Sequence, residues 1–274
     1  MDLSLDHSVI LNNGVKIPIL GLGTWTLRGK RAYQAVTWAL EIGYKLIDTA
    51  SFYGNEEDIG KAISDSKIDR DEIFITTKVW NDEQGYDETL KAIDRSLKRL
   101  KLNHVDLYLI HWPVMAKRLD TWKAMEKILE MEKAKAVGVS NFTIKHLKEL
   151  LESSSLIPAV NQVEFSPFLY QKELLEFCNE KGIKLEAYCP LTRGRKFNNP
   201  VIKSISEKYN KTPAQIMIRW GLQHGIIEIP KSGNKNHLFE NANVFDFSLN
   251  SIDMEQLDSL DEGFRLVDDP LFYE

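Results

Sequence analysis

Short runs of apolar and β-branched residues alternate with longer helical patterns along almost the whole chain of 274 residues. The run from Val105 to Ile110 is apolar at nearly every position, which is typical of a parallel strand covered on its outer face by helices. Eight βα units in one chain predict a single domain over residues 1–274, an α/β fold of the (β/α)8 TIM barrel type. A doubly wound open sheet is the alternative. The predicted strands are 19–24, 45–48, 73–78, 105–111, 136–140, 159–164, 184–188 and 226–229.

Two segments between the strands carry clear helix signals. Apolar residues recur at spacings of three and four from Leu90 to Leu100 and again from Ile144 to Leu151, which predicts one buried face on each helix. Asn55 precedes three acidic residues. It is predicted to be the N-cap of a helix whose first turn holds negative charge.

The N-terminal region predicts a β-hairpin before the barrel. Residues 9–11 and 15–17 are apolar or β-branched, and the Asn-Gly pair between them favours a tight turn with a positive φ. Gly21 and Gly23, which follow the hairpin, match the first two glycines of the Rossmann dinucleotide-binding fingerprint. Position 26 is Thr where that fingerprint requires a third glycine, so we reject this interpretation.

Composition excludes several classes of protein. A net charge of −5 argues against a nucleic-acid-binding surface. No apolar stretch approaches the ~18 residues of a membrane span, and the N-terminus lacks the features of a secretory signal. Cys178 and Cys189 are the two cysteines of the chain, and we expect reduced thiols in a cytoplasmic protein. The spacing of histidines and cysteines predicts no metal site.

Polar residues close several of the predicted strands. Asp48, Lys78 and His111 end three successive strands, and Tyr53 follows the first of them. In a barrel these ends meet at one mouth, where Asp48 and Lys78 can neutralise each other. The ammonium would stabilise an ionised phenol, so we expect the pKa of Tyr53 to fall below ~10. A phenol of that kind can donate a proton near neutral pH.

Three tryptophans lie directly after predicted strand ends. Trp25, Trp80 and Trp112, with Tyr53 and His111, are predicted to line a substrate pocket that favours apolar or aromatic carbonyl compounds. Such a pocket can protonate an oxygen but contains no source of electrons. The reducing equivalent must therefore come from a bound cofactor.

Seven short motifs occur in order from the first strand to the last. The chain resembles the aldo-keto reductase superfamily from about Ile10 to Phe272, and most closely its prokaryotic branch of the 2,5-diketo-D-gluconate reductase type. The resemblance implies NADPH-dependent reduction of aldehydes and ketones by a cytoplasmic monomer. The motifs are 21–25, 47–56, 77–80, 111–113, 138–142, 161–162 and 229–232.

The resemblance also implies roles for individual residues. Tyr53 is the general acid, and Lys78, paired with Asp48, lowers the pKa of its phenol. His111 orients the carbonyl group, which receives hydride from C4 of the nicotinamide. The cofactor-binding residues implied are Thr24, Asp48, Ser140, Asn141, Gln162, Tyr188, Pro190, Leu191, Thr192, Lys231, Ser232, Gly233, Asn234, His237, Glu240 and Asn241.

One position departs from the family pattern. His237 stands where the family commonly has an arginine that contacts the adenosine 2′-phosphate. Histidine gives less charge and lacks the planar fork of arginine. We therefore expect NADPH to be preferred and NADH to be used measurably.

Two other functions remain open at this point. One is a cofactor-binding sensor or regulatory subunit that uses the same barrel with little turnover, which an assay of NADPH consumption would separate from an enzyme. The other is a lyase or isomerase with Lys78 as a Schiff-base amine. Pairing with Asp48 argues against the latter, because it keeps the amine protonated.

Overall fold

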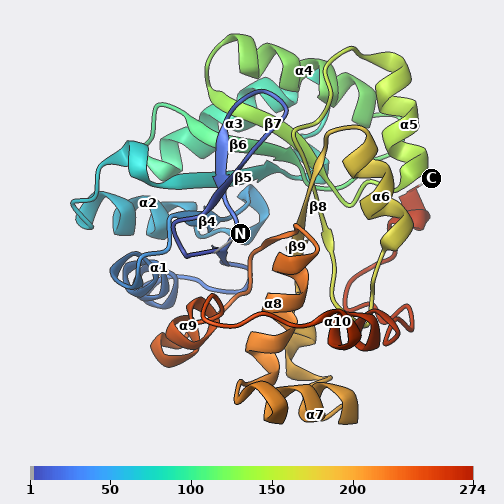
Figure 1. Ribbon diagram of the computed structural model, residues 1–274. Coiled ribbons are helices and arrows are strands. Elements are labelled where there is room, and N and C mark those ends of the chain that lie inside the picture. Colours follow the sequence, from blue (N-terminus) through green and yellow to red (C-terminus); the bar gives the residue numbers. More distant parts are fainter. Residues whose placement is uncertain (1–2, 274) are drawn as a thin grey trace.

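The computed structural model describes residues 3–273 and shows a ring of eight parallel strands surrounded by helices (Figure 1). Each strand pairs with the next along the chain, from β3 to β10. Parallel bridges from Leu20 to Glu228 and from Gly23 to Lys231 join the two ends and close the ring. The predicted TIM barrel is confirmed. The strands are β3 (Gly21–Gly23), β4 (Leu46–Asp48), β5 (Phe74–Val79), β6 (Val105–Ile110), β7 (Ala134–Ser140), β8 (Val160–Glu164), β9 (Lys184–Tyr188) and β10 (Ile227–Glu228).

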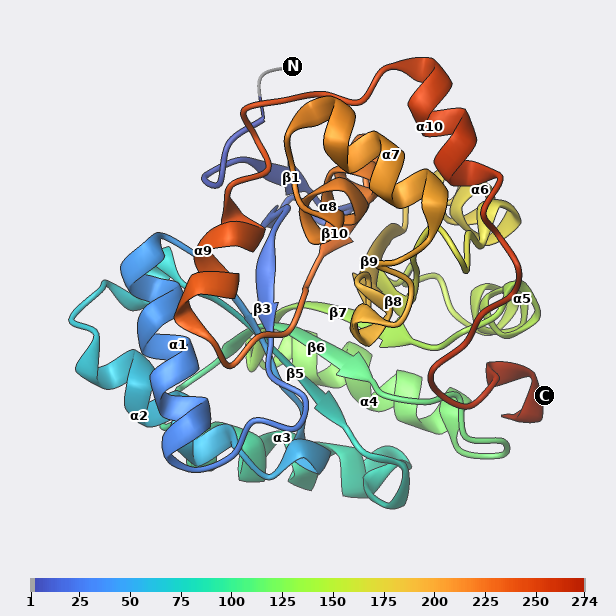
Figure 2. The ribbon, with the colours of Figure 1, turned by 90° about the horizontal axis from the view of Figure 1, so that it is seen from below.

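Helices follow the strands and cover the outside of the barrel (Figure 2). Among residues 3–273, none of them combines the length and the apolar character that a membrane crossing requires. The helices are α1 (Lys30–Ile42), α2 (Glu56–Asp65), α3 (Tyr86–Leu100), α4 (Arg118–Glu130), α5 (Ile144–Ser153), α6 (Lys172–Glu180), α7 (Pro200–Tyr209), α8 (Pro213–Gln223), α9 (Lys235–Ala242) and α10 (Ser251–Asp258).

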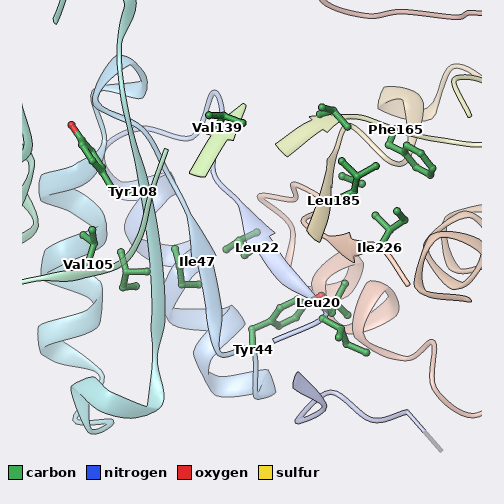
Figure 3. Close-up of a cluster of buried hydrophobic side chains, with 14 of the residues drawn as sticks. Leu20, Leu22, Tyr44, Ile47, Val105, Tyr108, Val139, Phe165, Leu185 and Ile226 are labelled. Atoms are coloured by element: carbon green, nitrogen blue, oxygen red, sulfur yellow. The ribbon is translucent and has the colours of Figure 1, made fainter. Parts of the chain in front are cut away.

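The core has two layers because side chains alternate across each strand. Outward residues such as Leu22, Ile47 and Leu185 pack against the helices (Figure 3). Inward residues such as Leu46 and Ile227 fill the barrel. Full burial of each such side chain contributes about 1.5–3 kcal/mol, so the apolar strands drive the closure of the ring.

The hairpin closes one end of the barrel. Its strands β1 (Ser8–Ile10) and β2 (Lys16–Pro18) are antiparallel, and Gly14 in the turn has φ 89°. Leu11 and Ile17 are buried against the barrel interior. Asn12 Nδ2 donates to the carbonyl of Pro158, just before β8, so the hairpin lies at the N-terminal ends of the strands. The opposite mouth is left for chemistry.

The start of α2 differs in one respect from the sequence prediction. The helix begins directly after Asn55, but the side chain of Asn55 does not cap it. Instead, Asn55 Nδ2 donates to the carbonyls of Thr24 (3.1 Å) and Leu27 (2.8 Å), and Asn55 Oδ1 accepts from Thr49 Oγ1 (2.6 Å). These bonds tie the loop after β3 to the loop after β4, which carries Tyr53.

Candidate active site

A buried ion pair lies at the C-terminal mouth of the barrel. Lys78 of β5 has no exposed surface, and its Nζ donates to Asp48 Oδ1 at 2.7 Å and to the Thr49 carbonyl at 2.9 Å. The same Nζ lies 3.4 Å from Tyr53 Oη. The 3₁₀ turn Ser51–Tyr53, directly after β4, brings the phenol to this place. The structure therefore unites the three side chains that the sequence assigned to one mouth.

The pKa of Tyr53 does not fall as the sequence argument predicted. Burial, and after it the negative charge on Asp48, raise the pKa of Tyr53 well above 10. Lys78 is already neutralised by Asp48 at 2.7 Å, so little of its positive charge acts on the phenol. At neutral pH Tyr53 is consequently a protonated phenol in a buried position.

His111 follows β6 at the same mouth. Burial, together with the charge on Lys78, lowers the pKa of His111 well below 6.5, so its imidazole is neutral. Its Nδ1 is buried and has no hydrogen-bond partner among residues 3–273. The ring meets Tyr53 edge-on, with centroids 5.6 Å apart. A neutral imidazole beside the phenol can donate one N–H to a carbonyl oxygen.

Aromatic rings form one wall beside Tyr53. Phe52 stacks on Trp80 with centroids 3.7 Å apart and on Trp25 at 5.5 Å, and Trp80 meets His111 at 5.0 Å. Trp25 and Phe52 keep 38% and 43% of their surface exposed, and contiguous exposed apolar rings of this kind are suited to contact with a ligand. The sequence analysis missed Phe52, although it directly precedes Tyr53.

Trp112 lies apart from this wall. Its ring stacks on Tyr273 at 5.2 Å, and its carbonyl accepts from Gln84 Nε2. The C-terminal segment reaches Trp112 after crossing the end of β8, where Glu164 accepts from the backbone of Leu266 at 2.8 Å. Trp112 therefore fixes the C-terminal segment at the edge of the mouth.

Polar side chains from β7, β8 and β9 form a connected network next to Asp48. Tyr188 Oη donates to Asn141 Oδ1 at 2.7 Å, and Asn141 Nδ2 donates to the His111 carbonyl at 2.9 Å. Ser140 Oγ donates to the backbone carbonyl of Gln162, whose own side chain donates to Asp48 Oδ2 at 2.8 Å. This donor and acceptor set fits the carboxamide of a nicotinamide ring.

A group of cations lies between α1, the loop after β9 and the loop after β10. Burial and the charges of Arg31 and Arg193 lower the pKa of Lys231. A Cβ on Gly233 would lie 3.6 Å from a guanidinium nitrogen of Arg31. Within the part of the chain that the structure describes, no carboxylate forms an ion pair with these three cations. Unpaired positive groups in one place are suited to a phosphate. The sequence analysis named Lys231 and missed the two arginines.

Other predicted cofactor residues lie on α9 and in the loops after β9 and β10. Asn234 caps α9, and its Oδ1 accepts from the backbone N of Asn236 and, at 3.4 Å, from that of His237. His237 is exposed on the first turn of that helix. The carboxylate of Glu240 accepts from Thr212 at 2.6 Å. Pro190, Leu191 and Thr192 form the loop after β9, Ser232 follows β10, and Asn241 is buried.

Comparison with known proteins agrees with this geometry. Residues 19–262 match the model of the Aldo/keto reductase family. The glyoxal reductase of Bacillus subtilis (strain 168) is 48% identical over 98% of this chain and 98% of its own. An aldo-keto reductase from a Medee basin deep-sea metagenome library has a TM-score of 0.94 at 45% identity, over 96% of this chain and 98% of its own. The Bombyx mori aldo-keto reductase in complex with NADP has a TM-score of 0.92 at 34% identity, over 97% and 96% of the two chains. The chain therefore belongs to the aldo/keto reductase family and is an NADP(H)-dependent oxidoreductase.

Proposed function

We propose that Tyr53 donates the proton in carbonyl reduction, with Lys78 and Asp48 as its support and His111 as the group that orients the substrate oxygen. The observation that carries this proposal is the position of Lys78 Nζ, which lies 2.7 Å from Asp48 Oδ1 and 3.4 Å from Tyr53 Oη. These atoms lie beside the aromatic wall formed by Trp25, Phe52 and Trp80.

The protonation states of these residues suit a reduction. The raised pKa keeps the proton on Tyr53 until an alkoxide, which is a far stronger base than a phenolate, develops next to it. Neutral His111 presents an N–H and does not repel Lys78. When bound, the dihydronicotinamide supplies hydride to the carbonyl carbon. Because Lys78 stays paired with Asp48 as a cation, a Schiff-base function for its amine is disfavoured.

We assign the cofactor site from the same geometry. Ser140, Asn141 and Gln162 would hold the carboxamide, and the ring of Tyr188 would stack on the nicotinamide. The cations at Arg31 and Lys231 would bind the adenosine 2′-phosphate, which NADH lacks, and Arg193 would bind the pyrophosphate, with NADPH preferred and NADH used measurably. The other residues proposed to contact the cofactor are Thr24, Asp48, Pro190, Leu191, Thr192, Ser232, Gly233, Asn234, His237, Glu240 and Asn241.

The substrate class follows from the wall of the pocket. Stacked rings at Trp25, Phe52 and Trp80 favour flat aromatic or apolar carbonyl compounds. A small dicarbonyl, as named for the Bacillus subtilis relative, or a diketo sugar acid, as for the branch that the sequence resembles, can also reach the phenol. Initial rates of NADPH oxidation with glyoxal, an aliphatic aldehyde and an aromatic aldehyde test this order. We expect the aromatic aldehyde to have the highest kcat/KM, and a lack of turnover with all three would refute the proposed function.

Replacement of Arg31 should weaken NADPH binding more than NADH binding. The Arg31→Met variant removes one of three unpaired cations, and we expect the dissociation constant of NADPH to rise about 10-fold while that of NADH changes less than twofold. Titration of the intrinsic tryptophan fluorescence with each cofactor measures both constants. Lys30→Met is the matched control, because Lys30 is an exposed cation at the preceding position. Equal weakening of both cofactors by Arg31→Met would contradict the assignment.

Addition of a cation at His237 should have the opposite effect. In His237→Arg, a guanidinium on the first turn of α9 adds a charged hydrogen-bond donor to the group of cations that includes Lys231. We expect NADPH to bind about 10-fold more tightly and NADH to be affected little. Asn236→Arg adds the same charge one residue away and serves as the control. If that control matches His237→Arg, the gain comes from net charge and the proposed contact is absent.

A further inference from the structure

Glu186 is a buried acid that has no place in the mechanism above. It lies in β9 between Leu185 and Ala187, which both face the helices. Glu186 therefore points into the barrel, and it is fully buried. An acid in this position requires a partner, because burial of an isolated carboxyl group is costly.

The partner of Glu186 is the side-chain amide of Gln162. Gln162 Nε2 donates to Glu186 Oε2 at 2.7 Å and to Asp48 Oδ2 at 2.8 Å. An amide nitrogen carries two protons, so these two bonds use both. Rotation of the amide by 180° would place its oxygen against Asp48 Oδ2 and would remove the donor from Glu186 Oε2. Glu186 and Asp48 together fix the orientation in which Gln162 Oε1 remains available to another donor.

The same contacts form a continuous chain to the phenol. Asp48 bridges Gln162 and Lys78 with its two oxygens, and Lys78 Nζ reaches Tyr53 Oη at 3.4 Å. Glu186 is thus the far end of a chain of hydrogen bonds that begins at Tyr53. Loss of the acceptor at Glu186 would release one amide proton of Gln162 and allow the amide to turn.

The charges around Glu186 decide its protonation state. It faces Asp48 of β4, Lys78 of β5 and Tyr53 of the turn after β4. Burial, and then the charge on Asp48, raise the pKa of Glu186 to about 8. Its Oε2 accepts from Gln162, and its Oε1 is buried without a partner among residues 3–273. The neighbouring acid Glu228 points away, toward Gly221 of α8.

We infer that Glu186 is a positioning residue that fixes the Gln162 amide and, through it, Asp48 and Lys78. Ionisation of Glu186 would place a second negative charge beside one ammonium. That charge raises the pKa of Tyr53 further, which makes the phenol a weaker proton donor. The inference rests on the proposed roles of Tyr53, Asp48 and Lys78.

Two substitutions distinguish the role of Glu186 as a hydrogen-bond acceptor from the effect of its ionisation. Glu186→Gln keeps an acceptor oxygen but cannot ionise, whereas Glu186→Leu removes the acceptor at similar volume. At pH 7 we expect Glu186→Gln to keep kcat within about threefold, and Glu186→Leu to lose about 100-fold in kcat/KM through misplacement of the amide. Only Glu186→Leu should also weaken NADPH binding in a fluorescence titration. If Glu186→Leu keeps wild-type kcat/KM and cofactor affinity, the positioning role is wrong.

The pH profile tests the proton on Glu186. Wild-type kcat/KM should decline above about pH 8, where Glu186 ionises, and Glu186→Gln should lack this step. If Glu186 serves only to pack the barrel, Glu186→Gln should show the same decline of kcat/KM above about pH 8 as the wild type. Should Tyr53→Phe keep its turnover while the Glu186 variants behave as expected, the proposed function fails and the inference about the network does not.

Unfolding without cofactor gives an independent measurement. The folded protein holds a proton on Glu186 up to about pH 8, whereas the unfolded chain releases it near pH 4.3. Glu186 therefore contributes a loss of stability as pH rises between these values, and Glu186→Gln lacks this contribution. The difference in Tm between Glu186→Gln and the wild type should grow from pH 5 to pH 8 and then level off. Glu255→Gln, at an exposed acid of α10, should show no such trend, and parallel profiles for Glu186→Gln and the wild type would overturn the assignment.

Discussion

The Tyr53→Phe variant should lose about 1,000-fold in kcat for aldehyde reduction while its dissociation constant for NADPH stays within about twofold of the wild type. The phenylalanine ring can keep the contacts that Tyr53 makes with Trp25 and His111, at 4.8 Å and 5.6 Å. Only the hydroxyl that carries the proton is removed. Stopped-flow measurement of NADPH oxidation, together with a fluorescence titration, separates turnover from binding.

Tyr86→Phe is a suitable control for this experiment, because Tyr86 is exposed at the start of α3 and loses the same single hydroxyl. We expect the control to retain full activity. A Tyr53→Phe enzyme that keeps more than a tenth of its turnover would show that another group supplies the proton. Equal loss in both variants would indicate a defect of the preparation.

The Lys78→Met variant should lose both activity and stability. Lys78 and Asp48 are 0% and 3% exposed at their side chains and lie 2.7 Å apart. Without the ammonium, the Asp48 carboxyl group is buried with no cation, which costs about 3–5 kcal/mol. For a chain of this length that corresponds to a decrease in Tm of roughly 10 °C. The turnover falls as well, because Tyr53 loses the contact with Lys78 Nζ.

A second substitution distinguishes charge from packing in this pair. Lys78→Met combined with Asp48→Asn removes both charges, and Gln162 can still donate to the amide oxygen at position 48. We expect scanning calorimetry to show that the double variant regains more than half of the lost stability, while NADPH oxidation stays as low as in Lys78→Met. A single variant as stable as the wild type would mean that the buried carboxyl group does not need its cation.

Much of the barrel could be predicted from local patterns alone. Apolar strands with turn residues between them give the number and order of the strands, and the structure keeps each within a few residues of its predicted position. The first and the last strand are shorter than predicted, because 19–24 is reduced to Gly21–Gly23 and 226–229 to Ile227–Glu228. The first and last strands meet through the isolated bridges Leu20–Glu228 and Gly23–Lys231. The length of each of these strands therefore depends on its pairing partner more than on its own residue types.

The roles of several side chains depend on neighbours that are far away in the sequence. Asn55 has the sequence signature of a helix cap, yet its amide bonds the carbonyls of Thr24 and Leu27. Arg31 lies on α1 with nothing in its local sequence to indicate a site, and the fold brings it beside Gly233. Phe52 is one apolar residue among many until Trp80 stacks on it at 3.7 Å.

The sequence by itself determined which residues end the strands, and hence that Asp48, Lys78 and His111 share one mouth with Tyr53, because parallel strands in a barrel all end at the same side. Only the tertiary structure decided the protonation of that mouth. The pKa of Tyr53 rises because the phenol is buried and because the negative charge of Asp48 lies beside it. The pKa of Glu186 rises to about 8 because the barrel places it next to Asp48. Burial and charge–charge distances act through space, so they exist only once the ring has closed.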